Sequence, residues 1–216
     1  MSEIVVFGAN GRAGQRIVKE ALNRGHSVKA VVRYPDAAVD VDPRAILVKG
    51  DATIASSVGE HVSSTDAVVL AIGSYSVTPW LKAAKTVVGV LSTHPTPRPR
   101  LLHMGGGASL LAPDGGTIMD GAHFPPQYLE NAKAQLLALD WYRANARDAG
   151  VNWTYVSPPP VHFAPGERRG TYRTALDTPV VDSEGVAVLS YEDLAVAIVD
   201  EIESPKYMNK RFTAGY

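Results

Sequence analysis

The chain has 216 residues, of which 45% are hydrophobic and 20% charged, with 21 Lys and Arg against 22 Asp and Glu. These values are typical of one globular domain and exclude intrinsic disorder as the main state. A formal net charge of -1 provides no basic footprint, so we expect neither nucleic acid nor a membrane surface as a partner.

Absent residue types and motifs narrow the function further. The sequence contains no Cys, which excludes disulfides, thiolate metal sites and a Cys nucleophile. The six His are scattered and no His-Glu-x-x-His motif occurs, so we predict no metal site. No run approaches the roughly 20 apolar residues of a membrane span. Glu3 leads directly into a strand-like run, unlike a signal peptide, and we therefore expect a cytoplasmic protein.

The first half of the chain alternates between strand-like and helix-like segments. Short apolar or β-branched runs predict strands at 4–7, 27–32, 46–48, 67–72 and 101–104. Helix-forming segments at 12–24, 53–60 and about 81–91 lie between them, and Thr53 is a candidate N-cap. This alternation predicts an α/β fold with a doubly wound parallel sheet and right-handed crossovers.

The second half is less regular. Residues 128–147 contain no Gly or Pro and many Ala and Leu, which predicts a long helix, and a sixth strand is expected at 152–156. Short strands at 171–174, 186–189 and 211–213, with a helix at 190–203 capped by Ser190, predict a small C-terminal α+β extension. We expect a single domain over residues 1–216, in which residues 157–216 form the substrate side.

A loop of about twenty residues, 105–126, is rich in Gly and Pro. Loops of this length in a compact domain are usually functional or mobile. We interpret it as a lid or as one wall of a pocket.

The strongest motif is a glycine turn between the first strand and the first helix. Gly8, Gly11 and Gly14 have the spacing GxxGxxG, which differs from the GxGxxG of the common dinucleotide fingerprint. Glycines here let the backbone approach a pyrophosphate, and free N–H groups at the helix start attract phosphate. A tight structural turn is the alternative interpretation. The position of the turn in an alternating chain favours the cofactor.

Arg33 ends the second predicted strand, about twenty residues after the glycine turn. An acid at this place would bind the ribose hydroxyl of NADH, whereas a guanidinium suits the 2′-phosphate of NADPH. Arg12, inside the turn, could contact the same phosphate. Asp36 is the rival acid, but Pro35 has already turned the chain. We therefore favour NADPH, with two solvated surface arginines as the alternative.

Eight segments together carry a family resemblance that covers nearly the whole chain. The chain resembles the atypical short-chain dehydrogenase/reductase group, especially its small NAD(P)H-binding, NmrA-like branch, which includes flavin reductase/biliverdin-IX-beta reductase. The segments are 4–14 (IVVFGANGRAG), 31–33 (VVR), 49–51 (KGD), 71–73 (AIG), 101–106 (LLHMGG), 153–159 (WTYVSPP), 190–196 (SYEDLAV) and 211–213 (RFT).

The resemblance implies a Rossmann-like fold with an NADP(H) site at the carboxyl ends of the strands. By position, the implied cofactor-binding residues are Gly8, Asn10, Gly11, Arg12, Ala13, Gly14, Arg33, Asp51, Ala52, Ala71, Ile72, Gly73, Met104, Gly105, Ser157, Pro158 and Pro159. The last five would flank the nicotinamide.

The superfamily's Tyr-x-x-x-Lys pair has no proper counterpart. Tyr128 and Lys133 are five residues apart, which places them about 140° apart around a helix. Ser109 is the nearest candidate for the accompanying serine. His162 is the best candidate for a proton donor, ahead of His103 and His123, although each His is also compatible with a structural role. Tyr75, Phe124 and Phe163 are candidates for an aromatic wall around a planar substrate, with ordinary packing as the alternative.

These features favour an NADPH-dependent oxidoreductase that transfers hydride to a small planar acceptor, such as a flavin or quinone, because the cofactor carries most of that chemistry. A non-catalytic NADP(H)-binding redox sensor of the NmrA-like type is the alternative. A sugar-nucleotide epimerase or dehydratase ranks third, because such enzymes need the tyrosine–lysine pair. A monomer or a weak dimer is expected.

Overall fold

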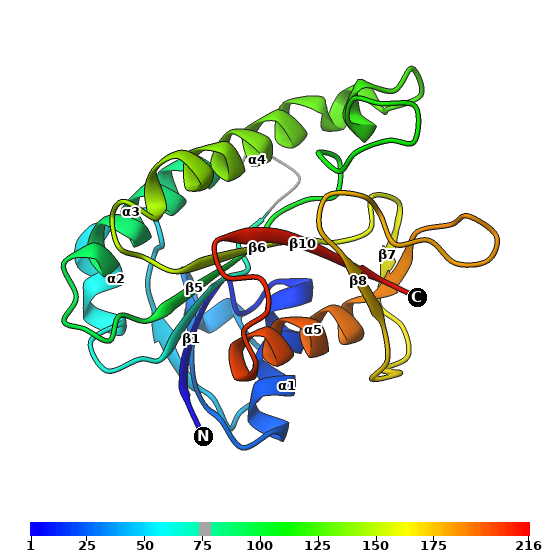
Figure 1. The fold of residues 1–216 in the computed structure, drawn as a ribbon. Coiled ribbons are helices and arrows are strands. Elements are labelled where there is room, and N and C mark those ends of the chain that lie inside the picture. Colours follow the sequence, from blue (N-terminus) through cyan, green and yellow to red (C-terminus); the bar gives the residue numbers. More distant parts are fainter. Residues whose placement is uncertain (74–78) are drawn as a thin grey trace.

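The computed structural model describes residues 1–73 and 79–216, and an eight-stranded sheet forms its centre (Figure 1). The strand order is β3-β2-β1-β4-β5-β6-β10-β8, in which β8 alone is antiparallel to its neighbour. The strands are β1 (Glu3–Phe7), β2 (Ser27–Val32), β3 (Ile46–Lys49), β4 (Ala67–Leu70), β5 (Arg100–Met104), β6 (Trp153–Ser157), β8 (Arg173–Ala175) and β10 (Lys210–Gly215). A separate parallel pair is formed by β7 (His162–Ala164) and β9 (Val188–Ser190).

Five α-helices cover both faces of the sheet in the described part of the chain (Figure 1). They are α1 (Arg12–Asn23), α2 (Ala55–His61), α3 (Trp80–Ser92), α4 (Leu129–Trp141) and α5 (Tyr191–Glu203). Helices α1 and α5 pack on one face, and α2, α3 and α4 pack on the other. The predicted doubly wound, Rossmann-like α/β fold is therefore confirmed, and its small C-terminal extension contains β7, β8 and β9.

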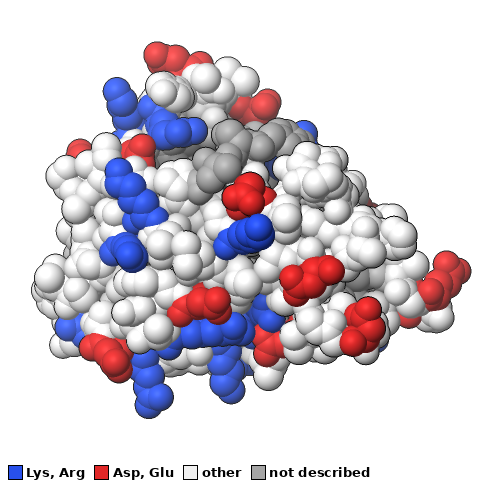
Figure 2. Space-filling model, turned by 90° about the horizontal axis from the view of Figure 1, so that it is seen from above, with Lys and Arg blue, Asp and Glu red and all other residues white. Residues whose placement is uncertain are grey.

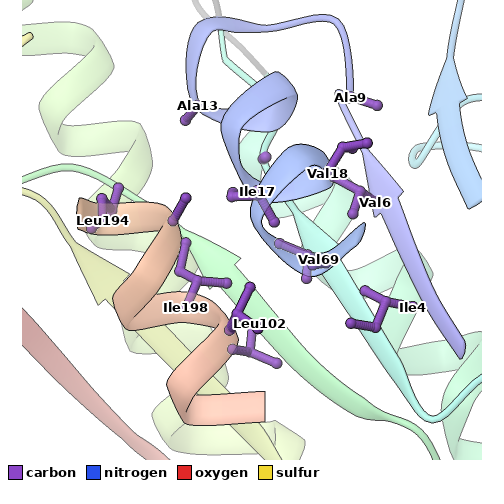
Figure 3. Packing of buried hydrophobic residues seen from close by; sticks show 14 of the residues in the cluster. Ile4, Val6, Ala9, Ala13, Ile17, Val18, Val69, Leu102, Leu194 and Ile198 are labelled. Carbon is purple, nitrogen blue, oxygen red and sulfur yellow. The ribbon is translucent and has the colours of Figure 1, made fainter. Parts of the chain in front are cut away.

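The buried residues of β1 alternate between two cores. Ile4 and Val6 point toward α1 and α5, where they meet Ile17 and Ile198 (Figure 3). The intervening residues, Val5 and Phe7, belong to the core under α2, α3 and α4. This two-sided burial explains why the strands are continuous apolar runs, as is usual for parallel sheets.

Charged side chains link α1 to α5 and to the extension. Glu20 is buried and accepts hydrogen bonds from Arg24 at 2.8 Å and from Arg168 at 2.7 Å. Arg24 also contacts Asp200 and Glu203 on α5.

On the opposite, α4 side of the molecule, acidic and basic side chains are interspersed over the surface (Figure 2). No helix in the described ranges is long and apolar enough to span a bilayer.

Several predicted element boundaries were wrong. Thr53 is not an N-cap: α2 begins at Ala55, and the Thr53 N–H instead donates to Asp51 Oδ1 at 2.8 Å. The long predicted helix is divided into a 3-10 turn at 126–128, α4, and a π-helical turn at 142–146. The strands predicted at 171–174 and 186–189 begin two residues later.

The N-cap of α5 was predicted correctly. Ser190 Oγ accepts a hydrogen bond from the Asp193 N–H at 3.0 Å. The buried Asp193 carboxylate does not complete a capping box. It accepts hydrogen bonds from the N–H groups of Arg169 and Gly170 and from the Tyr216 hydroxyl, and so ties the 166–170 loop to the last residue.

Candidate functional site

A cavity of about 470 Å³ opens at the carboxyl ends of β1, β2, β3 and β4. The strand order reverses between β1 and β4, and ligands of open α/β sheets bind at such a point. Of the predicted cofactor residues, those that line the cavity are Gly8, Asn10, Gly11, Arg33, Asp51, Ala52, Ala71, Ile72 and Gly73. The structure thus brings together residues from four separate loops.

The glycine turn is too tight for side chains. Gly8 has a φ of +80°, and a Cβ there would lie 2.5 Å from the carbonyl oxygen of Ala71 on the neighbouring loop. A Cβ on Gly14 would lie 2.1 Å from the carbonyl oxygen of Gly8. The Gly11 N–H donates to the same oxygen at 3.0 Å. The first and third glycines therefore let α1 and β4 pack directly against the turn.

Helix α1 starts with features that suit an anion. Gly11 is its N-cap, so no side chain caps the first N–H groups, and the first turn contains no acid. The exposed Arg12 adds positive charge at this end. Uncapped N–H groups and the helix dipole form a phosphate site. The residues present therefore fit the pyrophosphate of a dinucleotide, while the buried Ala13 and Gly14 support the turn from behind.

The β2 and β3 ends form a second wall with a different character. Arg33 is exposed, its guanidinium carbon lies 5.9 Å from the ring centre of Tyr34, and it has no ion-pair partner among the described residues. Asp51 is held by the start of α2, since its N–H donates to Ser57 Oγ at 2.9 Å. A Cβ on Gly50 would lie 2.6 Å from Val31 Cγ1 and 2.9 Å from His61 Nε2, so the wall is closely packed.

At the β4 end, the lining residues within 1–73 and 79–216 carry no charge. Ala71, Ile72, Gly73 and Pro79 are the lining residues there, and Trp80 packs behind Gly73, 3.1 Å from the position of a Cβ. The predicted flanking residues Met104, Gly105, Ser157, Pro158 and Pro159 follow β5 and β6 and lie outside the cavity lining. Gly105 lies directly on Tyr155, whose hydroxyl would be 2.0 Å from a Cβ at that position.

The structure separates Tyr128 from Lys133 and from the cavity. Tyr128 lies in the 3-10 turn before α4 with 49% of its surface exposed. Lys133 lies on α4 and forms an exposed ion pair with Glu130 at 3.4 Å. Neither side chain lines the cavity. Within residues 1–73 and 79–216, no tyrosine–lysine pair approaches it.

The other candidate catalytic residues have structural surroundings. Ser109 is buried, and its Oγ accepts a hydrogen bond from Arg211 at 3.0 Å. His162 is exposed on β7, away from the cavity lining. Burial lowers the pKa of His103 to about 3, so this ring is neutral, and its Nδ1 lies 3.0 Å from the Tyr142 hydroxyl. A neutral, buried His103 cannot supply protons near pH 7.

Two of the three predicted aromatic wall residues, Phe124 and Phe163, lie outside the cavity lining. Phe163 packs on Tyr191, with ring centres 4.1 Å apart, and Phe124 lies in the 105–126 loop outside the cavity lining. Tyr75 lies outside the described residues. Six lining residues were not among the predicted cofactor residues: Phe7, Val31, Val32, Gly50, Thr53 and Pro79. Thr53 follows Asp51-Ala52 directly, so its position was a usable signal.

The first part of the 105–126 loop is fastened to the body of the protein. The Leu111 N–H donates to the Asp177 carbonyl at 2.8 Å, and Arg211 donates to the Ser109 carbonyl at 2.9 Å. A β-bridge joins Leu111 to Thr117. These contacts fix the first part of the loop against the rest of the protein. The lid function of the loop stays a prediction.

Comparison with known proteins agrees with this geometry. Residues 8–205 match the model of an NAD(P)H-binding family. The chain belongs to this family. It is 34% identical to the uncharacterized protein YwnB of Bacillus subtilis over 219 residues, which covers 98% of this chain and 97% of YwnB.

Solved structures extend the likeness. A candidate NADH-flavin reductase from Streptococcus pneumoniae is 31% identical, with a TM-score of 0.85, and the match covers 100% of this chain and 99% of that one. A candidate epimerase from Bacteroides thetaiotaomicron is 32% identical, also with a TM-score of 0.85, over 99% and 96% of the two chains. A nicotinamide cofactor and the atypical short-chain dehydrogenase/reductase resemblance both agree with these matches.

Proposed function

We propose that this protein is an NADPH-dependent oxidoreductase that passes hydride to a small planar acceptor of the flavin or quinone type. The observation that carries the proposal is the division of the cavity. One end has the exposed Arg33 and the uncapped start of α1, and at the other end the lining residues that the structure describes are all non-ionisable.

The preference for NADPH rests on Arg33. Its guanidinium lies at the carboxyl end of β2 and has no carboxylate partner in the described chain, so it is available for a 2′-phosphate. Arginine forks bind phosphate oxygens in pairs. The rival Asp36 lies further on, in the exposed 3-10 turn at 35–37, and does not line the cavity.

The acceptor class follows from what the chain offers at the β4 end. When bound, the nicotinamide supplies hydride. Hydride addition to a simple ketone leaves an alkoxide, which needs a proton from a nearby acid. Ala71, Ile72, Gly73 and Pro79 hold no such proton. A flavin or a quinone instead becomes a delocalised anion that water can protonate, so these residues need only orient the acceptor and exclude solvent.

The first test is a titration with NADPH and, separately, NADH. We expect Arg33→Ala to weaken NADPH binding by about tenfold or more, since a charge-assisted hydrogen bond contributes roughly 1.5–3 kcal/mol, and to leave NADH binding unchanged. Arg147→Ala is the matched control, because Arg147 is also exposed but lies beyond α4. Equal losses for both nucleotides would contradict the assignment of Arg33 to the 2′-phosphate.

The second test separates an enzyme from a sensor. NADPH oxidation is followed with riboflavin, FMN and menadione as acceptors, and with an aromatic aldehyde for comparison. Turnover with the planar acceptors alone supports the proposal. Tight NADPH binding without turnover would favour the redox-sensor alternative, which the separation of Tyr128 from Lys133 also suits. Loss of turnover in Tyr128→Phe would favour tyrosine chemistry of the epimerase kind.

A further inference from the structure

Strand β3 is an end strand of the sheet and has an apolar, unpaired edge. Among the described residues it pairs only with β2. Ile46 is 62% exposed and Leu47 is 40% exposed, and they point to opposite faces of the strand. The other end strand, β8, is three residues long and presents Arg173 and Thr174. Edges are normally protected by charge and shortness. Strand β3 is also short, at four residues, but its exposed Ile46 and Leu47 are adjacent and its one charged residue, Lys49, lies at its end.

The backbone groups that face outward from β3 can be identified. The Gly50 N–H donates to the Val32 carbonyl at 2.9 Å, so Gly50 faces β2. The backbone N–H and carbonyl groups of successive strand residues point to opposite edges of the strand. Those of Ile46 and Val48 therefore also point to β2, while those of Ala45, Leu47 and Lys49 point away from it. Two outward groups are already satisfied. The Ala45 N–H donates to the Asp42 carbonyl at 3.0 Å, and the Lys49 carbonyl lies 2.9 Å from His61 Nε2.

Four outward backbone groups remain: the Ala45 carbonyl, the Leu47 N–H and carbonyl, and the Lys49 N–H. No partner for any of them exists within residues 1–73 and 79–216. This set is self-complementary. In an antiparallel pair about a twofold axis at Leu47, the two Leu47 residues exchange both of their hydrogen bonds, and each Lys49 N–H meets the Ala45 carbonyl of the other copy. This register leaves two outward groups without a partner in the other copy, the Ala45 N–H and the Lys49 carbonyl. Both are already hydrogen-bonded within their own chain.

We propose that two copies of this chain associate through β3, antiparallel about Leu47, to form one continuous sheet. Each Ile46 then covers Val48 of the other copy, and the Leu47 side chains meet across the axis. In this register Lys49, which is exposed and has no ion-pair partner in the described chain, comes to the Ala45 end of the other strand. The carboxylate in the turn there, Asp42, already pairs with Arg44 at 2.6 Å, so the register rests on the backbone groups rather than on charge.

The isologous geometry explains why a second copy is the occupant. A twofold contact uses the same patch on both molecules, so every donor must find its acceptor in an identical surface. Four hydrogen bonds between the copies meet that condition. A strand from a different protein would have to offer the same spacing of donors and acceptors and to leave the same two positions unpaired.

The test uses two exposed leucines as matched sites. Light scattering after size-exclusion chromatography, over a wide range of protein concentration, should give the mass of two chains for wild type. Leu47→Asp should give one chain at every concentration. Leu137→Asp is the control, because Leu137 is 56% exposed on α4 and would disrupt a dimer formed through that helix instead. Circular dichroism checks that both variants are folded.

Single cysteines give a second readout, since the chain contains none. Leu47→Cys should be joined into a covalent dimer by a short bismaleimide, and Leu137→Cys should not. A wild-type protein that stays at one chain at its highest soluble concentration would overturn the proposal. So would a Leu47→Asp variant that still has the mass of two chains, or equal cross-linking at both positions.

Discussion

Gly14→Ala is a direct test of how the glycine turn is built. The change adds one methyl group inside α1, where alanine is normally a better helix former than glycine. In this turn the methyl would lie 2.1 Å from the carbonyl oxygen of Gly8 and 3.0 Å from Cα of Ala9. Both are backbone atoms, so the helix and the turn must move apart. We therefore expect the opposite of the usual helix rule.

The magnitude follows from two opposing contributions. Overpacking a tight contact costs about 1–3 kcal/mol, and a collision with backbone belongs near the upper end. The gain in helix propensity returns about 1 kcal/mol. The net loss in the free energy of unfolding is then about 2 kcal/mol, which lowers the Tm of a chain of this size by roughly 4–8 °C. Because the displaced turn contains Gly11, NADPH binding should weaken by at least about tenfold, or 1.4 kcal/mol.

The matched control is Gly89→Ala on the exposed side of α3, where a Cβ would meet nothing within 4 Å. The same substitution there should raise the Tm by up to about 4 °C, since only the propensity gain applies. Tm is measured by calorimetry, and binding by titration with NADPH. If Gly14→Ala were as stable as Gly89→Ala and bound NADPH like wild type, the close packing of α1 on the turn would be refuted.

Three further predictions concern other parts of the molecule. Tyr128→Phe should leave steady-state NADPH oxidation within about twofold of wild type, because Tyr128 is exposed outside the cavity. The Arg168 and Arg24 guanidinium groups hold the pKa of Glu20 below its usual 4.5. The ionised Glu20 therefore stabilises the fold above pH 4.5, and this contribution is lost as the pH falls through the pKa of the folded state. Glu20→Gln should lower the Tm at neutral pH and make the Tm fall less steeply on acidification. Arg211→Met should cost about 2–3 kcal/mol in urea unfolding, because buried hydrogen bonds to Ser109 are lost with the ion pair to Asp177.

The doubly wound parallel sheet and the cofactor edge could be predicted because they depend on local signals. A parallel strand buried on both faces is an uninterrupted apolar run, and Ala67–Leu70 is one. The glycine turn is recognisable in the sequence, because the positive φ of residue 8 and the close backbone contact at residue 14 both require glycine. The residues that follow parallel strands all lie at the carboxyl edge of the sheet, whichever face the connecting helices cover.

The far side of the site could not be predicted because it depends on long-range partners. Ser109 was a candidate catalyst by its distance from the fifth strand, yet Arg211, 102 residues later, accounts for its hydroxyl. Phe163 was a candidate wall residue, but it packs on Tyr191. In each case a partner elsewhere in the fold determines what the side chain does.

Strand β3 takes part in both proposals, yet the two can fail independently. Its outward residue Leu47 carries the contact between copies, whereas Gly50 and Asp51, just beyond its carboxyl end, form a wall of the cavity. A Leu47 variant therefore changes the association without touching the cavity lining, and Arg33→Ala changes the cavity without touching the edge. If dimer formation rigidifies the Gly50–Asp51 wall, then it raises the affinity for NADPH, and NADPH raises the affinity between the two copies by the same factor. The factors are equal because coupling between two binding equilibria is reciprocal. NADPH affinity that is identical in wild type and Leu47→Asp would then mean that the wall is already rigid in one chain, as the close contacts of Gly50 with Val31 and His61 indicate.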